Sequence, residues 1–156
     1  RVAEVAREEA ERAREEEEWS REFDKTLKAA DLGDAGAQYN LGFRYFFGKD
    51  YVAKDYAEAL KWFRKAAGQG YGKAQFSLGF LYEHGHGVQE NDAEAFKWYR
   101  KAAEQGYADA QYNLGNMYDK GRGVSEDKAE ALNWWRKAAE QGHEDANEWL
   151  EYLKAK

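Results

Sequence analysis

The sequence predicts an all-α fold built from stacked helix pairs. Residues 34–70, 71–106 and 107–142 repeat one pattern, the 156 residues include no proline, and apolar residues recur with helical spacing. A period of about 36 residues is typical of solenoids, in which each unit buries its apolar face only against its neighbours. We therefore expect three two-helix repeats, preceded by a long helix within residues 1–33 and followed by a capping helix within residues 143–156.

The N-terminal segment is expected to form one long helix over residues 3–31. No glycine interrupts it, and the segment KAADLGDAGAQ at 28–38 aligns with KAAEQGYADAQ at 101–111. Its last part therefore matches the second helix of a repeat that lacks its first helix. The buried side of this half repeat is predicted to consist of Phe23, Leu27 and Ala30.

The early part of this helix is strongly acidic. Residues 1–24 contain ten acidic and five basic residues, which gives −5 of the chain's net charge of −6. We interpret this part as a solvated extension, because no sustained apolar heptad is visible. The alternative is a helix that binds a partner or forms a coiled coil.

The second helix of each repeat is predicted to be amphipathic, with a broad buried face around Trp62, Trp98 and Trp134. Each helix has a candidate N-cap, with a glutamate three residues later; the caps are Asp55, Asn91 and Asp127. Each helix is expected to end in a left-handed glycine, at Gly70, Gly106 and Gly142.

The first helix of each repeat has an apolar arc that is wide enough to contact two neighbouring helices. A glycine recurs inside this arc, at Gly42, Gly79 and Gly115. Because a helical glycine costs about 1 kcal/mol relative to alanine, its recurrence predicts a close approach of the backbone to large aromatic side chains.

The order of alanine, YNLG, tyrosine, a glycine turn, tryptophan and KAAEQG resembles the Sel-1-like repeat family over about residues 25–147. This family is related to tetratricopeptide repeats, and the resemblance implies a right-handed α-solenoid. It also implies an adaptor role, as in bacterial secretion, envelope and signalling complexes or eukaryotic protein quality control. The first repeat has GKDYV where the others have GHGV and GRGV, so we expect its loop to be reshaped.

One face of the first helices is left free by this packing, and its residues change freely between repeats. We predict that it binds a partner through Asn40, Phe43, Phe47, Lys73, Ser77, Phe80, His84, Asn113, Asn116 and Lys120. Exposed aromatics in a patch usually bind something, and asparagines can pair with a peptide backbone. The alternative is that Phe43, Phe46 and Phe47 pack under the GKDYV loop or against the long helix.

The predicted function is a non-catalytic scaffold that binds a peptide or protein segment on the concave face, with a homodimer through the exposed aromatics as a further option. No cofactor is expected. Nucleic acid is not expected as a partner because the net charge is negative, and membrane insertion is not expected because no apolar run approaches about 20 residues. The near-consensus repeats are also compatible with an engineered or truncated scaffold. No compartment is indicated.

Two chemical motifs are weighed against this function. SEDK at 125–128 has the S-x-x-K spacing of serine β-lactamases, to which cysteine-rich relatives of the family have been linked, but the partner motifs are missing. HGH at 84–86 offers two histidines, for which adventitious metal binding is expected rather than a built site. The chain has no cysteine, which excludes disulfides, thiolate zinc sites and cysteine nucleophiles.

Overall fold

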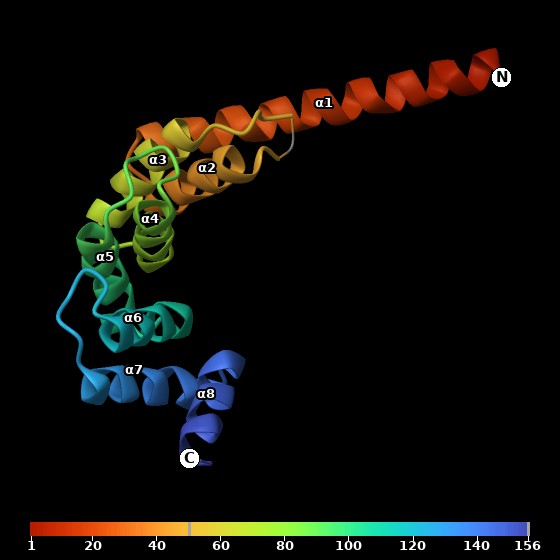
Figure 1. Ribbon diagram of the computed structural model, residues 1–156. Coiled ribbons are helices and arrows are strands. Elements are labelled where there is room, and N and C mark those ends of the chain that lie inside the picture. The colour runs from red at the N-terminus through yellow and green to blue at the C-terminus, as the bar shows by residue number, and fades with distance from the viewer. Residues whose placement is uncertain (50, 156) are drawn as a thin grey trace.

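The computed structural model describes residues 1–49 and 51–155. These residues form eight α-helices and no strands, which confirms the all-α solenoid. The helices are α1 (Val2–Asp31), α2 (Ala35–Phe47), α3 (Tyr56–Gly68), α4 (Gly72–His84), α5 (Asp92–Glu104), α6 (Ala108–Lys120), α7 (Lys128–Glu140) and α8 (Glu144–Lys154). They follow one another along an arc, and α1 projects from one end as a straight rod (Figure 1).

Each helix packs mainly against the helices before and after it in the chain. The hairpins α2–α3, α4–α5 and α6–α7 are the three repeats, and every second helix also packs on the next first helix. The buried residues of the described chain form four clusters along the stack, which the half-buried Tyr45, Tyr82 and Phe76 link to one another. One leucine of each first helix is fully buried, at Leu41, Leu78 and Leu114. None of the helices described is both long and apolar enough to cross a membrane.

The recurring helical glycines have the close neighbours that the sequence predicts. A Cβ added at Gly42 would lie 2.6 Å from Phe63 Cδ1, one at Gly79 would lie 2.7 Å from Tyr99 Cδ1, and one at Gly115 would lie 2.5 Å from Trp135 Cδ1. Each of these aromatic rings therefore packs directly on the backbone of its own repeat's first helix, and any larger residue would push the two helices apart.

The predicted N-caps are confirmed. Asp55 accepts hydrogen bonds from the backbone N–H groups of Ala57 and Glu58, and Asn91 and Asp127 make equivalent bonds. The cap's own backbone N–H donates to a tyrosine carbonyl of the preceding first helix, at Tyr45 for Asp55. This N–H is therefore not bonded to the glutamate, as it would be in a capping box, and Glu58 instead pairs with Lys61. At the other end, Gly70, Gly106 and Gly142 adopt the predicted left-handed conformation, with φ of +86°, +93° and +84°.

Buried glutamines connect each repeat to its neighbours. Gln75 Nε2 donates to the carbonyl of Ala67 in the preceding helix, and its Oε1 accepts from Gln105 Nε2 at 2.7 Å. Gln38 makes the same pair of bonds, to Ala30 and from Gln69. Gln111 repeats the arrangement with Ala103 and Gln141. The bond to Ala30 shows that the end of α1 has the place of a second helix, as the half-repeat alignment predicts.

The two halves of α1 differ in their surroundings. Ala30 is buried and Phe23 and Leu27 are half-buried against α2, as predicted, whereas residues 2–18 are exposed along their whole length. Trp19 marks the boundary, because it stacks on Phe23 with ring centroids 5.0 Å apart and also contacts Tyr51 of the loop after α2.

The loop of the first repeat is reshaped, as the GKDYV segment predicts, although Asp50 lies outside the described residues. Tyr51 has a positive φ of +63°, which is unusual for a non-glycine residue, and its ring reaches Trp19 on α1. Val52 is buried beside it. At the other end of the chain, Glu148 and Glu151 are exposed on α8, where earlier first helices have a tyrosine or phenylalanine and a glycine.

Candidate functional site: the inner face of the first helices

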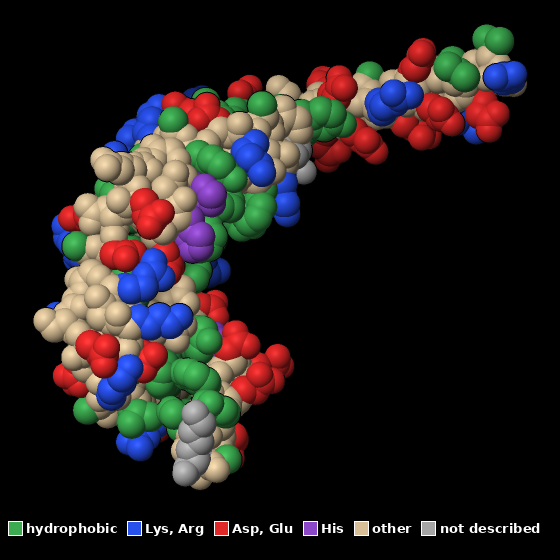
Figure 2. Space-filling model, viewed as in Figure 1, with side chains coloured by type: hydrophobic (Ala, Val, Ile, Leu, Met, Phe, Trp, Pro, Cys, Tyr) green, Lys and Arg blue, Asp and Glu red, His purple; other side chains and the backbone are tan. Residues whose placement is uncertain are grey.

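The ten predicted partner-binding residues lie on α2, α4 and α6, and all of them are accessible. Five are exposed: Asn40, Phe47, Lys73, His84 and Lys120. The others are half-buried: Phe43, Ser77, Phe80, Asn113 and Asn116. Hydrophobic side chains gather beside the histidines on the inner side of the arc (Figure 2).

An apolar hollow of about 240 Å³ opens between α2 and α4. It is lined by Tyr39, Phe43, Phe46, Phe47, Phe63, Phe76, Ser77 and Phe80. The rings contact one another within α2, with 4.6 Å between the centroids of Phe43 and Phe47, and across to α4, with 5.9 Å between those of Phe46 and Phe80. Four of the ten predicted residues are thus brought together, and the other six lie outside the hollow.

The sequence left open whether the three phenylalanines of α2 lie on an open face or pack under the GKDYV loop, and the structure shows some of each. The loop after α2 does cover part of them, because Lys49 Nζ lies 5.4 Å from the ring centroid of Phe43 and 5.6 Å from that of Phe47. Phe46 packs against Tyr56 and His86. The contact with the long helix is made by Tyr51 instead, so the hollow stays open with a cation at its rim.

His84 and His86 extend the aromatic wall. The ring of His84 stacks on Phe80 with a centroid distance of 4.1 Å, and its Nδ1 lies 3.1 Å from the Phe80 carbonyl oxygen. His86 stacks on Tyr56 at 4.5 Å. Among residues 1–49 and 51–155, no three His, Cys, Asp or Glu side chains are arranged to hold a metal ion.

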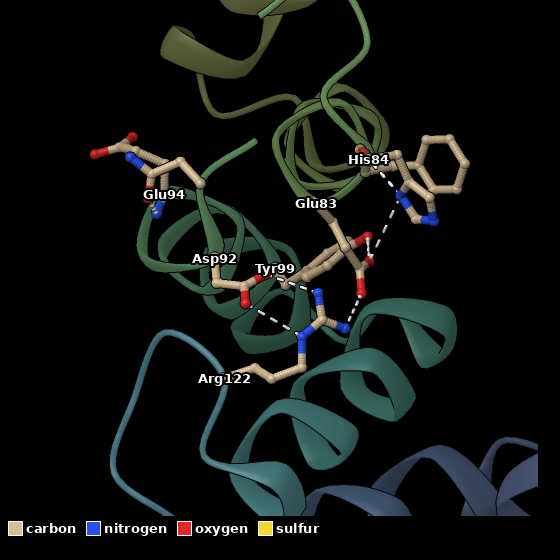
Figure 3. Close-up of polar contacts among 8 residues, drawn as sticks. Glu83, His84, Asp92, Glu94, Tyr99 and Arg122 are labelled. Atoms are coloured by element: carbon tan, nitrogen blue, oxygen red, sulfur yellow. Dashed lines mark hydrogen bonds and ion pairs between the residues drawn. The ribbon is translucent and has the colours of Figure 1, made fainter. Parts of the chain in front are cut away.

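A charged network lies where α4, α5 and the turn after α6 meet (Figure 3). Arg122 Nη1 donates to Glu83 Oε1 at 2.8 Å, and its Nη2 and Nε donate to the two carboxylate oxygens of Asp92 at 2.7 and 3.2 Å. The hydroxyl of Tyr99 donates to Glu83 Oε2 at 2.7 Å. Burial and the negative charge of Glu83 raise the pKa of Tyr99 far above its usual value, so it stays a neutral donor.

The third repeat presents amides and a cation in place of aromatics. Trp135 Nε1 donates to Asn116 Oδ1 at 3.1 Å. Because the indole N–H can only donate, Asn116 must offer it the oxygen, and its NH₂ group is left as an available donor. Lys120, one turn further along α6, is exposed and makes no ion pair within the described part of the chain.

The lysine of the S-x-x-K motif is already bonded to other groups. Lys128 Nζ donates to the carbonyl oxygen of Asp119 at 2.6 Å and to its carboxylate at 3.0 Å. These bonds raise the pKa of Lys128 above its usual value. A lysine that is to act as a base needs a lowered pKa, so this environment opposes a role beside Ser125.

Two aromatic residues of the inner face were missed by the sequence analysis. Trp149 and Tyr152 of α8 are 36% and 46% exposed, and their rings stack with centroids 5.1 Å apart at 7°. They occupy the places in α8 that Asn113 and Asn116 have in α6, because both pairs are 36 residues apart. Continuing the repeat register into α8 would have revealed them.

The fold and this inner face define a helical-repeat protein with an open, partly aromatic concave surface. The chain belongs to the Sel1 repeat family, whose repeat pattern matches residues 35–71, 72–107 and 108–143. The resemblance seen in the sequence is thereby confirmed.

Solved structures and curated proteins agree with this membership. The chain is similar to a Sel1 repeat protein from Oxalobacter formigenes, with 41% identity, a TM-score of 0.77 and coverage of 84% of this chain and 98% of that one. It is similar to a protective antigen of uropathogenic Escherichia coli with an SLR fold, with 47% identity, a TM-score of 0.76 and coverage of 80% and 26%. It is also 46% identical over 65 residues to the chitin synthase regulator SKT5 of Saccharomyces cerevisiae, a match that spans 41% of this chain and 9% of SKT5.

Proposed function

We propose that this chain is a non-catalytic protein-interaction module that binds a peptide or protein segment along the inner face of α2, α4 and α6. Sel1 repeat proteins generally act in protein–protein interactions, and that role is the starting point for this chain. The observation that carries the proposal is the hollow between α2 and α4, in which seven of the eight lining residues are aromatic.

The chemistry of the hollow favours an apolar side chain as its occupant. Aromatic pockets that stay partly open in the free protein are typical anchor sites, because burying an apolar side chain removes both surfaces from water. The half-exposed rings of Phe43 and Phe47 and the histidine stacked on Phe80 would close over such a side chain. Lys49 at the rim would favour a carboxylate nearby.

The relatives support an interaction role and leave the partner open. One is a component of an ERAD-associated ubiquitin ligase, HRD3A of Arabidopsis thaliana, which is 38% identical over 58 residues, or 37% of this chain and 9% of that protein. Since the curated relatives are so much longer, we propose for this chain only an interaction role, which is to hold another protein.

The test replaces the aromatic column of the first two repeats with the residues that the third repeat has at the same positions. The variant is Phe43→Asn/Phe47→Lys/Phe80→Asn, and peptides selected by the wild type from a random 12-residue library are measured by fluorescence polarisation. We expect binding at least tenfold weaker, with similar helicity by circular dichroism. A control variant, Val5→Asn, changes an exposed apolar residue far from the face.

Three results would contradict the proposal. If the triple variant unfolds at a much lower temperature, the phenylalanines are core residues. If light scattering finds a wild-type dimer and a monomeric variant, the face binds a second copy of this chain instead. Hydrolysis of a chromogenic β-lactam by the wild type, lost in Ser125→Ala, would contradict the non-catalytic assignment.

A further inference from the structure

We propose that the inner face of the first helices forms a binding groove with two aromatic anchors. The first is the hollow between α2 and α4, and the second is formed on α8 by Trp149 and Tyr152. The groove would then take an extended peptide segment with an apolar side chain at each end and an acidic residue between them. This inference rests on the proposed function and specifies its ligand.

The repeat register places Trp149 and Tyr152 on the binding face. Moving by 36 residues leads from Ser77 to Asn113 and to Trp149, and from Phe80 to Asn116 and to Tyr152. Ser77 and Phe80 line the hollow on the α4 side. The residues of α8 therefore occupy, two repeats later, the positions that form the wall of the first anchor site.

The helix behind this wall is equivalent as well. Phe63 of α3 lines the first hollow together with Ser77, and Trp135 has the same place in α7. Trp135 meets Trp149 edge to face, with ring centroids 5.7 Å apart at 73°. The same indole donates its N–H to Asn116. Asn116 and Trp149 thus both contact Trp135. The polar residues of α6 are therefore directly next to the aromatic residues of α8.

The centre of the groove offers donors and positive charge to a ligand. The free NH₂ of Asn116 and the ammonium of Lys120 lie one turn apart on the same side of α6. Two nearby acids are already paired, Glu83 with Arg122 and Asp119 with Lys128. Lys120 makes no ion pair among the described residues, so a ligand carboxylate could pair with it without displacing another acid, although the chain as a whole has a net charge of −6.

Along α6 and α8 the opposite edge of the face is acidic, which orients the ligand, although Lys73 has the equivalent position in α4. Asp109 and Asp145 lie in the first turns of α6 and α8, and Asp109 is 3.2 Å from His143. Lys49, His84 and Lys120 lie at or just beyond the C-terminal ends of their first helices. The acidic residue of the ligand should consequently lie toward the C-terminal ends of these helices.

The distance between the two anchors sets the spacing of the ligand's apolar residues. Helices that pack together lie about 10 Å apart, whereas α4, α6 and α8 are joined through the second helices between them, so the two steps from α4 to α8 together exceed about 20 Å. An extended chain advances about 3.3 Å per residue, and at least about six residues are needed to span this distance.

The test uses fluorescein-labelled peptides with two tryptophans separated by two to ten residues, with a central Asp or Lys in an otherwise Gly/Ser spacer. The α8 variant Trp149→Asn/Tyr152→Asn carries the residues of α6 at these positions, and Val5→Asn is the control. We expect the Asp peptide with a spacer of six or more residues to bind at least tenfold more tightly than a one-tryptophan peptide, because the second anchor binds intramolecularly. The affinity of the two-tryptophan peptide for the α8 variant should fall to that of the one-tryptophan peptide. Lys120→Glu should make the protein prefer the Lys peptide over the Asp peptide.

The outcomes separate this inference from the proposed function. If spacing has no effect and the α8 variant binds as the wild type does, the second anchor is refuted while the hollow stands. If Lys peptides bind the wild type as well as Asp peptides do, the acidic centre is refuted. If light scattering shows that the α8 variant only dissociates a dimer, the occupant is a second copy of the chain. If no peptide binds the wild type, both proposals fail.

Discussion

At the scale of single residues, the recurring helical glycines show how packing overrides intrinsic propensity. Alanine is the better helix former by about 1 kcal/mol, yet the first helices have glycine at three equivalent positions. At each of them a ring from the second helix occupies the space of a Cβ.

Gly79→Ala should therefore destabilise the protein. The new Cβ would lie 2.7 Å from Tyr99 Cδ1, and overpacking of this kind costs about 1–3 kcal/mol. The matched control is Gly68→Ala in the last turn of α3, where no atom lies within 4 Å and φ is not positive; this change should stabilise the protein by up to about 1 kcal/mol. Urea unfolding followed by circular dichroism measures both. Equal effects of the two variants would show that propensity, not packing, governs these positions.

Tyr99 should make stability fall at alkaline pH. Burial first, and then the charge of Glu83, raise the pKa of its hydroxyl in the folded protein, whereas the unfolded chain titrates near 10. The contribution of the Tyr99 hydroxyl to the unfolding free energy is complete below about pH 10. It is lost as pH rises above this value, because only the unfolded state then releases the proton. Tyr99→Phe should be less stable than the wild type at pH 7, with the gap narrowing between about pH 9 and pH 11. A constant gap in urea unfolding across this range would refute the coupling.

At the scale of the helices, the sequence was sufficient for most of the fold but not for the contacts between repeats. Helix bounds follow from apolar periodicity, the caps at Asp55, Asn91 and Asp127, and the terminal glycines. The glutamine bonds and the pairing of Arg122 with Asp92 join residues about 30 positions apart, and no helical period brings such residues together. For the candidate site, the register gave the free face of α2, α4 and α6. It could not show that Phe43, Phe47 and Phe80 close a hollow, since that depends on how adjacent repeats are rotated.

The turn after each first helix links its repeat to the one before. His86 stacks on Tyr56 of the preceding repeat, and Arg122 pairs with Asp92 of its own preceding repeat. The second pair is equivalent to the first, one repeat further along the chain. A double-mutant cycle with Arg122→Ala and Asp92→Ala should give a coupling of about 1 kcal/mol, because the pair is bidentate but half-exposed. The exposed pair Arg100 and Glu104 within α5 is the control, and its coupling should be smaller because water screens both groups. A coupling no larger than the control's would mean that the turn contributes little to the alignment of the repeats.

At the scale of the whole molecule, the chain consists of a packed solenoid and an acidic rod with different roles in stability. From Trp19 onward α1 is part of the stack, through its contacts with Phe23 and Tyr51 and through the bond from Gln38 to Ala30. Before Trp19 the helix is exposed on all sides. Since helix formation alone is marginal in water, this part is held mainly by continuity with the packed half.

Removal of residues 1–16 should consequently leave the solenoid intact. We expect the unfolding free energy to change by less than about 0.5 kcal/mol, because no packed side chain is lost, while the helical circular dichroism signal falls in proportion to the residues removed. As the matched change, Phe23→Ala in the full chain should cost about 2 kcal/mol or more, since Phe23 packs against α2 and Trp19. Light scattering on both forms tests the remaining alternative. A full-length dimer that becomes monomeric on truncation would show that the rod is a self-association helix, whereas monomers of equal stability would show that it is a solvated extension of the solenoid.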